Sequence, residues 1–301
     1  MTHMHEHNHH HEHQITSLNK SYIIGIALNS FFVVIEFGAG FWYNSLGLMS
    51  DAGHNLSDVA ALCLSLLAFR LTRVKTNENY TYGYKKSTVL VSLLNAVILL
   101  IAIGFILAES IQKFANPQPI EGKAIAYVAG IGVIVNALTA FLFMKDKDKD
   151  LNVKGAYLHM AADALVSIGV VASGIVISYT GWYIIDPIIG ICIALVILVS
   201  TWQLLHASIR LSLDGVPEGI AYDNIENSIL KVSGVCGAHH LHIWAISTTE
   251  NALTTHVVID NLQHMEEIKH ELREVLSRLS IGHATFEFET CNEKCECRTD
   301  S

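Results

Sequence analysis

Two stretches of the sequence each place a histidine four residues before an aspartate. The first pair lies in Asp51-Ala-Gly-His54-Asn-Leu-Ser-Asp58, and the second is His159–Asp163. Residues four apart in a helix lie one above the other, so each pair offers one imidazole nitrogen and one carboxylate to a single point. Two such helices facing each other supply two nitrogen and two oxygen ligands. That set suits tetrahedral Zn²⁺ better than Mg²⁺ or Ca²⁺, which prefer oxygen alone.

The alternative is that each pair forms a hydrogen bond that only holds helices together, as polar side chains inside membranes often do. Acids are poor candidates for that purpose, because burying one charge costs about 3 kcal/mol or more and each acid needs a partner. Two copies of one arrangement, each in the middle of an apolar segment, therefore favour a metal site. Nearby, Asp51 could attract cations and Asn55 could orient a ligand, although helix capping and helix packing explain them equally well.

The segments that carry these pairs are long and apolar. Of the 301 residues, 51% are hydrophobic and only 16% are charged, whereas soluble proteins average about 25% charged residues. About twenty apolar residues suffice to cross a bilayer. We therefore expect an α-helical membrane protein with six transmembrane helices, at residues 21–43, 47–70, 87–113, 123–144, 154–180 and 183–206.

The charges of the loops predict the orientation in the bilayer. Lysine and arginine gather in the connections after the second and fourth segments, at positions 70, 73, 75, 85, 86, 145, 147, 149 and 154. Basic loops stay in the cytoplasm, so both termini are expected there. The start of the chain lacks the pattern of a signal peptide, and the short loops favour a bacterial cell (inner) membrane. The net charge of −9 argues against nucleic acid as a partner.

The pattern changes after Asp214. A helix is expected at 222–232, strands at 239–247 and 252–260, a helix with one apolar face at 268–279 and a strand at 283–289. This order predicts a small α+β layer whose few core residues favour association with a second copy. The expected domains are a disordered histidine-rich tail at 1–20, a membrane domain at 21–213, a cytoplasmic domain at 214–290 and a cysteine-containing tail at 291–301.

The motifs resemble those of the cation diffusion facilitator family over nearly the whole chain. The similar stretches are Ser45-Leu-Gly-Leu-Met-Ser-Asp51 with the pair that follows it, Tyr82-Gly-Tyr84, Gly155-Ala-Tyr-Leu-His159, Asp186-Pro187, Gly215-Val-Pro217 and His242-Ile-Trp244. The histidine that opens the first pair is similar to the zinc-transporting branch, since manganese and iron branches tend to have aspartate there. The resemblance implies six spans, a ferredoxin-like cytoplasmic domain, a homodimer, and export of metal from the cytoplasm in exchange for protons.

Further metal sites are expected outside the membrane segments. The first thirteen residues hold seven histidines and two glutamates, which could collect zinc or could be an inert tail. Histidines and glutamates also lie on or beside the predicted strands, and the resemblance implies regulatory zinc at several of them; the candidates are His239, His256, His283, Glu287 and Glu289, with His240, His242 and His270 as weaker ones. Surface histidines without a ligand are the alternative. The spacing of Cys291, Cys295 and Cys297 is not that of a common zinc site.

The sequence thus predicts a zinc/proton antiporter, not an enzyme, for which Zn²⁺ is the substrate and a regulator and for which Cd²⁺ and Co²⁺ are further candidate substrates. Neutral imidazole and deprotonated carboxylate bind the metal, so protons and zinc compete for His54, Asp58, His159 and Asp163. Two other functions stay open. A membrane-bound metal sensor would explain the later histidines but not the two pairs, and an intramembrane metalloenzyme would need a general base such as that of H-E-x-x-H.

Overall fold

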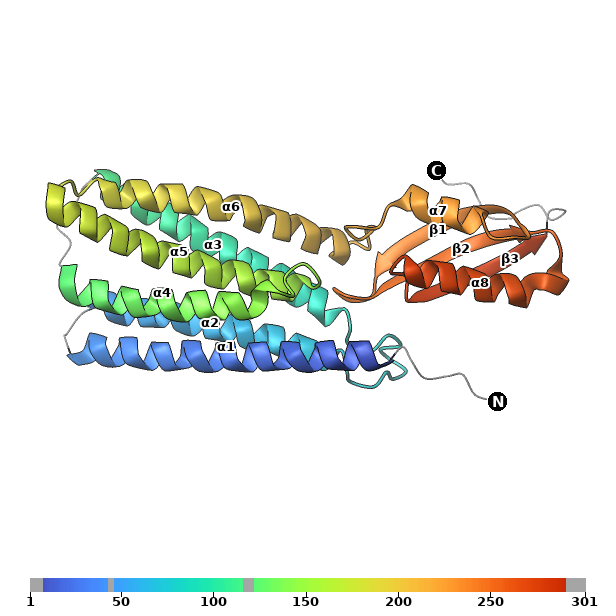
Figure 1. The fold of residues 1–301 in the computed structure, drawn as a ribbon, viewed down its shortest axis with the longest axis horizontal. Helices are drawn as coiled ribbons and strands as arrows, with labels where there is room; N and C mark the ends of the chain where they lie inside the picture. Colours follow the sequence, from blue (N-terminus) through green and yellow to red (C-terminus); the bar gives the residue numbers. More distant parts are fainter. Residues whose placement is uncertain (1–7, 43–45, 116–121, 291–301) are drawn as a thin grey trace. The chain divides into compact units, whose positions relative to one another are not determined.

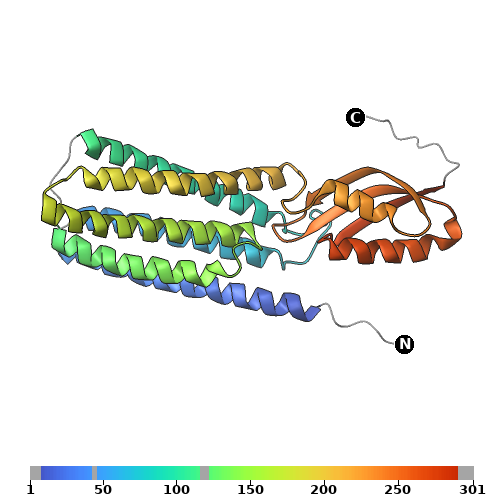
Figure 2. The ribbon, with the colours of Figure 1, turned by 45° about the horizontal axis from the view of Figure 1, so that its top comes forward.

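Six long helices open the chain and lie alongside one another as a bundle (Figures 1 and 2). The computed structural model describes the backbone of residues 8–42, 46–115 and 122–290. In these ranges the long helices are α1 (Asn8–Trp42), α2 (Leu46–Leu71), α3 (Ser87–Ala115), α4 (Gly122–Met144), α5 (Leu151–Thr180) and α6 (Ile185–Ser212). Each overlaps one of the six apolar segments expected from the sequence.

The start of α1 differs from the expectation of a disordered tail at 1–20. The helix begins at Asn8, so residues 8–20 belong to it, while residues 1–7 lie outside the described part. Nucleation is the costly step of helix formation, and each added residue then gains a hydrogen bond. An apolar helix that is already formed from about residue 21 can therefore be extended backwards through polar residues.

The bundle has polar side chains inside and apolar side chains outside. Its buried polar residues include Asn29, Ser92, Asn136, Thr139 and Ser208. Large apolar side chains point outward; Phe31 is 65% exposed, Phe105 71% and Trp202 60%. A water-soluble protein rarely exposes so much contiguous apolar surface, whereas a bundle in lipid needs an apolar outer face and inward polar groups. This distribution indicates a membrane protein.

Three helices in the described part are long and apolar enough to cross a membrane by length and composition: Lys20–Ala39, Ser87–Ala115 and Gly190–Ser212. A shorter apolar helix covers Gly130–Met144. The helices α2 and α5 do not meet the same criterion within the described residues. These two helices carry the His-x-x-x-Asp pairs.

Hydrogen bonds between polar side chains connect the helices. Asn29 Nδ2 donates to Thr139 Oγ1 at 3.1 Å, joining α1 to α4. The hydroxyls of Ser92 and Ser208 are 2.9 Å apart, joining α3 to α6. Such bonds hold transmembrane helices together. Apolar side chains alone give little preference for another helix over lipid, because lipid tails are equally apolar.

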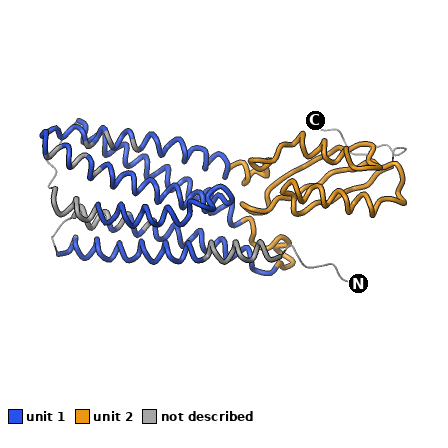
Figure 3. The backbone as a smooth tube through the Cα atoms, viewed as in Figure 1, with its two compact units in different colours: residues 1–75, 87–208 blue, residues 76–86, 209–301 orange. Residues whose placement is uncertain are grey.

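The chain divides into two compact units (Figure 3). The first consists of residues 1–75 and 87–208, and the second of residues 76–86 and 209–301. The second unit therefore begins earlier than the expected boundary at 214, and it includes a loop from between α2 and α3. Lys86 at the end of that loop explains both differences, since its Nζ donates to Leu211 O at 2.9 Å, Ala245 O at 3.0 Å and Asp214 Oδ1 at 2.5 Å.

The second unit contains the α+β layer predicted from the sequence. Its elements are α7 (Tyr222–Leu230), β1 (Val235–Ala245), β2 (Asn251–Ile259), a 3₁₀ turn η1 (Leu262–His264), α8 (Met265–Arg278) and β3 (His283–Thr290). The strand order is β1-β2-β3, with β1 antiparallel and β3 parallel to the central β2. A parallel pair requires a crossover, and α8 supplies it.

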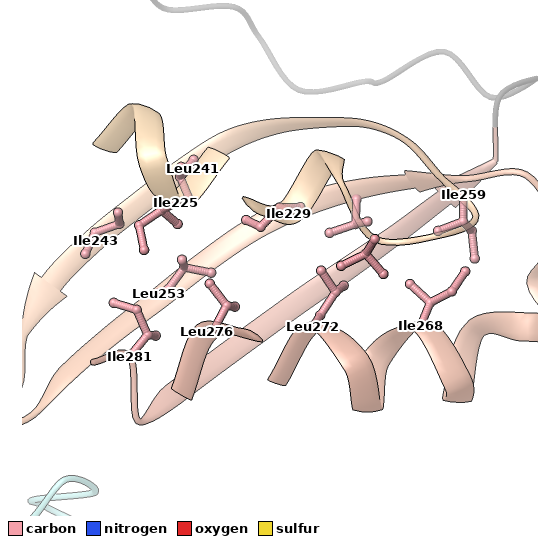
Figure 4. Packing of buried hydrophobic residues seen from close by; sticks show 12 residues of the cluster. Ile225, Ile229, Leu241, Ile243, Leu253, Ile259, Ile268, Leu272, Leu276 and Ile281 are labelled. Atoms are coloured by element: carbon pink, nitrogen blue, oxygen red, sulfur yellow. The ribbon is translucent and has the colours of Figure 1, made fainter. Parts of the chain in front are cut away.

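The core of this unit lies between the two helices and the sheet (Figure 4). Ile225 and Ile229 of α7, and Leu272 and Leu276 of α8, point toward Leu253 and its neighbours on the strands. The turn between α7 and β1 needs Gly234, whose φ is +87°. A Cβ there would also lie 2.8 Å from Ile268 Cδ1, so no larger residue fits without a shift.

Candidate metal centre

Three of the four predicted transport ligands lie together inside the bundle. His159 of α5 has its Nε2 2.5 Å from Oδ1 of Asp58 of α2, and 3.8 Å from Oδ2 of Asp163 one helical turn further along α5. One ligand atom from each residue lies within 4.8 Å of the other two. The i, i+4 spacing brings His159 and Asp163 together, and the packing of α2 against α5 brings Asp58 to them.

The separations suit a small divalent cation. Zinc binds nitrogen and carboxylate oxygen at about 2.0–2.2 Å, so neighbouring ligand atoms of a tetrahedron lie about 3.3 Å apart. The observed distances of 2.5 Å and 3.8 Å bracket that value. Without metal, His159 and Asp58 instead form a direct hydrogen bond, and a small separation of these two side chains would admit the ion.

The side chains of the cluster are largely buried. Asp58 is 2% exposed and His159 9%, and Asp163 is half-buried. Buried apolar side chains, Leu62 and Met160, lie close by in the sequence of the same two helices. Ionisable groups in such surroundings interact strongly with one another and with a cation, because little water screens them.

His54 and Asp51 belong to α2, but their side chains lie outside the described residues. The backbone of α2 is helical from Leu46, so the four-residue spacing between His54 and Asp58 falls within one helix. The role of His54 as the fourth ligand therefore stays a prediction.

Asn55, for which both ligand orientation and helix packing are open from the sequence, takes part in a buried hydrogen bond to α1. Its Nδ2 donates to Oε2 of Glu36 at 2.6 Å; Asn55 is 6% exposed and Glu36 only 1%. Glu36 is not among the site residues predicted from the sequence. An acid within an apolar span was the available indication, since ionisable residues inside a membrane are rare and functional or paired.

Replacing Glu36 with leucine is expected to destabilise the bundle, because it leaves the buried amide of Asn55 without that acceptor. The cost of an unsatisfied buried donor is about 1–3 kcal/mol, which should lower the thermal midpoint of the full-length protein in detergent by several degrees. Glu36→Gln keeps an acceptor oxygen and should retain most of the stability. Equal losses in both variants would mean that the charge matters rather than the hydrogen bond.

A second cluster lies on the sheet of the other unit. His256 of β2 has its Nδ1 2.6 Å from Oε1 of Glu289 of β3, and His239 of β1 has its Nε2 3.5 Å from the same oxygen. Glu287 lies 3.4 Å from His256 Nε2. His239, His256 and Glu289 each offer a ligand atom within 4.8 Å of the others. Strand pairing explains this, since His256 is opposite both His239 and Glu287.

A register shift brings one more histidine to this cluster. The pairing of β1 with β2 is irregular between His239 and His242, and His240 has a positive φ of 50°. The rings of His239 and His240 both lie within 5.2 Å of the ring of His256, measured between centroids. In a regular strand these consecutive side chains would point to opposite faces.

His283, also a candidate ligand from the sequence, lies apart from this cluster. It is opposite Ala252 at the start of β3, four residues before Glu287, and four residues of strand span about 13 Å. Its ring instead meets that of Tyr82 edge-on, with 5.6 Å between centroids. The cysteines Cys291, Cys295 and Cys297, and the histidines of residues 1–7, lie outside the described residues.

Comparison with known proteins assigns both units. Residues 22–211 match the cation efflux transmembrane domain, and residues 217–290 match the cytoplasmic domain of cation efflux proteins. The chain is 36% identical to the cadmium, cobalt and zinc/H(+)-K(+) antiporter of Bacillus subtilis, over 90% of this chain and 89% of the relative. It is 36% identical to the metal cation efflux system protein CzcD of Cupriavidus metallidurans, over 90% and 86% respectively.

A third relative is named as a zinc transporter. The zinc transporter ZitB of Escherichia coli is 32% identical over 89% of this chain and 86% of the relative. The transmembrane match alone covers more than half of the chain, and the relatives match along nearly all of it. The buried His–Asp cluster, the two matched domains and these relatives together show that the chain belongs to the cation diffusion facilitator family, with its zinc-transporting members.

Proposed function

We propose that this protein exports Zn²⁺ from the cytoplasm in exchange for protons, through a tetrahedral site formed by His54, Asp58, His159 and Asp163. The main support is the buried cluster of Asp58, His159 and Asp163 in a bundle with an apolar outer face. The names of the relatives, which include zinc transporters and metal efflux proteins, agree with it. Cd²⁺ and Co²⁺ are further candidate substrates, because nitrogen and oxygen ligands bind them as well.

The exchange follows from the chemistry of the ligands. The Nε2 of His159 can hold a proton or a metal ion, but not both. A hydrogen bond between His159 Nε2 and Asp58 Oδ1, at 2.5 Å, keeps a proton between the two atoms that would bind zinc. Zinc arriving from the cytoplasm must therefore displace it, and protons from a more acidic exterior must displace the zinc. Alternating access of the site to the two sides completes the cycle.

The proposed setting is a bacterial inner membrane, crossed six times, with both termini in the cytoplasm. The support is the six helices of the bundle and the basic residues at one set of their ends, such as Arg70 in the last turn of α2, Arg73 after α2 and Lys145 after α4. The second unit would then be cytoplasmic and ferredoxin-like. We expect a homodimer, since the core of this unit is small for an independent domain.

We propose further that the cluster of His239, His256, Glu287 and Glu289 binds a regulatory zinc ion. Replacing His239 with alanine should remove one zinc ion per chain, because loss of a ligand weakens metal binding at least as much as the 10–100-fold loss seen for ligand-supporting groups. If the bound zinc regulates transport, the apparent zinc affinity of transport should also change, by several-fold. Equilibrium dialysis of the full-length protein measures the stoichiometry. His283→Ala is the matched control, and unchanged stoichiometry in His239→Ala would remove this site.

Zinc uptake by proteoliposomes tests the proposed function against its two alternatives. Purified full-length protein should move zinc across the bilayer faster than protein-free vesicles do, as followed with an enclosed zinc-sensitive dye. A metal sensor and an intramembrane metalloenzyme both predict binding without flux. Absence of flux from correctly folded protein would therefore exclude transport.

A further inference from the structure

A small cavity adjoins the metal centre inside the bundle. Its lining includes Asp58 and Ser65 of α2, Asn95 of α3, and Gly155 and His159 of α5. The space open to the centre of a water molecule is about 20 Å³, and one water needs about 10–15 Å³ on this measure. The cavity thus has room for one water in contact with two of the proposed zinc ligands.

The cavity lies on one side of the metal centre along the helices. Ser65 follows Asp58 by seven residues, about 10 Å along α2, toward the end of that helix at Leu71. Gly155 precedes His159 by one turn, toward the start of α5 at Leu151. Both helix ends lead to the basic loops that the proposed topology places in the cytoplasm. The cavity is therefore on the side from which zinc would arrive.

Asn95, which lines the cavity, carries one buried acceptor without a hydrogen-bond partner among the described residues. Its Nδ2 donates to Ser65 Oγ at 2.7 Å, which holds the amide in one orientation. Its Oδ1 is buried and has no hydrogen-bond partner among the described residues. A buried carbonyl oxygen without a donor is unfavourable, so this position favours a molecule that brings one. Water bound to a divalent cation is a strong donor, because the metal polarises its O–H bonds.

We propose that Asn95 is a positioning residue for metal access, whose Oδ1 accepts a hydrogen bond from a water carried by the incoming divalent cation. The bond would hold the partly hydrated ion beside Asp58 and His159 while its other waters are exchanged for protein ligands. The hydrogen bond to Ser65 holds the amide group in one orientation beside the cavity. The inference rests on the proposed transport function, and it adds a residue outside the ligand set that sets how fast the ion reaches the site.

The test compares rates with equilibria in the full-length protein. Asn95→Leu removes the acceptor and should lower both the rate of zinc binding, measured by stopped flow in nanodiscs, and the kcat/KM of zinc uptake by roughly tenfold, the effect of one hydrogen bond to a charged group. The equilibrium Kd should not change, since the ligands remain. Asn95→Asp keeps an acceptor oxygen and should bind zinc at least as fast as the wild type.

The matched control is Asn136→Leu in α4. Asn136 is also buried, with an Oδ1 that lacks a partner among the described residues, but it does not line the cavity. Wild-type kinetics are expected for this variant, which would exclude a general effect of losing a buried amide. If Asn95→Leu does not fold, Asn95→Ala gives the same comparison with a smaller side chain.

Three results would overturn the inference: wild-type binding rates in the Asn95→Leu or Asn95→Ala protein, equal slowing by Asn95→Asp, or a Kd weakened as much as the rate. The first would leave the Ser65 contact as helix packing only, and the last would make Asn95 part of the metal site itself. Asp58→Ala is run beside these variants. Flux that persists in Asp58→Ala would count against the proposed transport site, independently of the outcome for Asn95.

Discussion

Replacing Asp58 or Asp163 with alanine is expected to lower zinc uptake by at least about a hundredfold. Each change removes a proposed ligand, and loss even of a group that only supports a ligand costs 10–100-fold in metal affinity. His159 touches both carboxylates, at 2.5 Å and 3.8 Å, so either change also removes a partner of a buried imidazole. The measurement is initial zinc flux into proteoliposomes at matched protein content.

Two further variants distinguish ligation from helix packing. Asp58→Asn keeps a group that can hydrogen-bond to His159 but loses the negative charge, and it should be as inactive as Asp58→Ala. Asp150→Asn removes another buried acid whose Oδ1 accepts from the backbone N–H of Asn152 at 2.7 Å before α5. Asparagine serves equally well at that position, so flux should be near wild type. Full activity in Asp58→Asn would mean that the His–Asp pairs are structural.

Zinc accumulation in vesicles is expected to follow the pH gradient. With the lumen one pH unit more acidic than the outside, each exchanged proton contributes about 1.4 kcal/mol, or a tenfold accumulation ratio. The direction of accumulation follows from competition between protons and zinc at His159 and Asp58. Protons leave the acidic lumen, and zinc enters the lumen in exchange. With equal pH on both sides, zinc should only equilibrate. The measurement is the steady-state ratio of internal to external zinc at several imposed gradients.

Collapsing the gradient provides the control for this experiment. A proton ionophore added at steady state should release the accumulated zinc, and vesicles with the Asp163→Ala protein should show no accumulation at any gradient. Accumulation that survives the ionophore would mean that zinc moves without proton exchange. That result would support zinc transport and contradict proton exchange.

One face of α2 connects the features on which these experiments bear. Asn55, Asp58, Leu62 and Ser65 follow one another at intervals of three or four residues, which places them along one side of the helix. Asn55 bonds to Glu36 of α1, Asp58 to His159 of α5, and Ser65 receives the amide of Asn95 of α3. Polar contacts thus extend from the metal centre in both directions along α2.

The sequence by itself predicted the features that depend on local periodicity. Residues four apart in a helix share a face whatever the tertiary structure is, so the pairing of His159 with Asp163 could be foreseen. Alternation of apolar residues predicted the strands of the second unit. The first of them, β1, begins four residues and ends two residues earlier than expected, at Val235 and Ala245. The family could be named because its motifs combine these local patterns with residue types that few other structures require.

Only the tertiary structure decided which distant residues meet. The contact of Asp58 with His159 spans 101 residues, and the partners Glu36 and Asn95 have no mark in the sequence beyond being polar in apolar helices. His283 shares the strand of Glu289 yet lies too far along it, because strand register decides what each residue faces. Helix and strand periods are set by the geometry of the backbone, whereas the rotation and register of each element depend on packing against the rest of the chain.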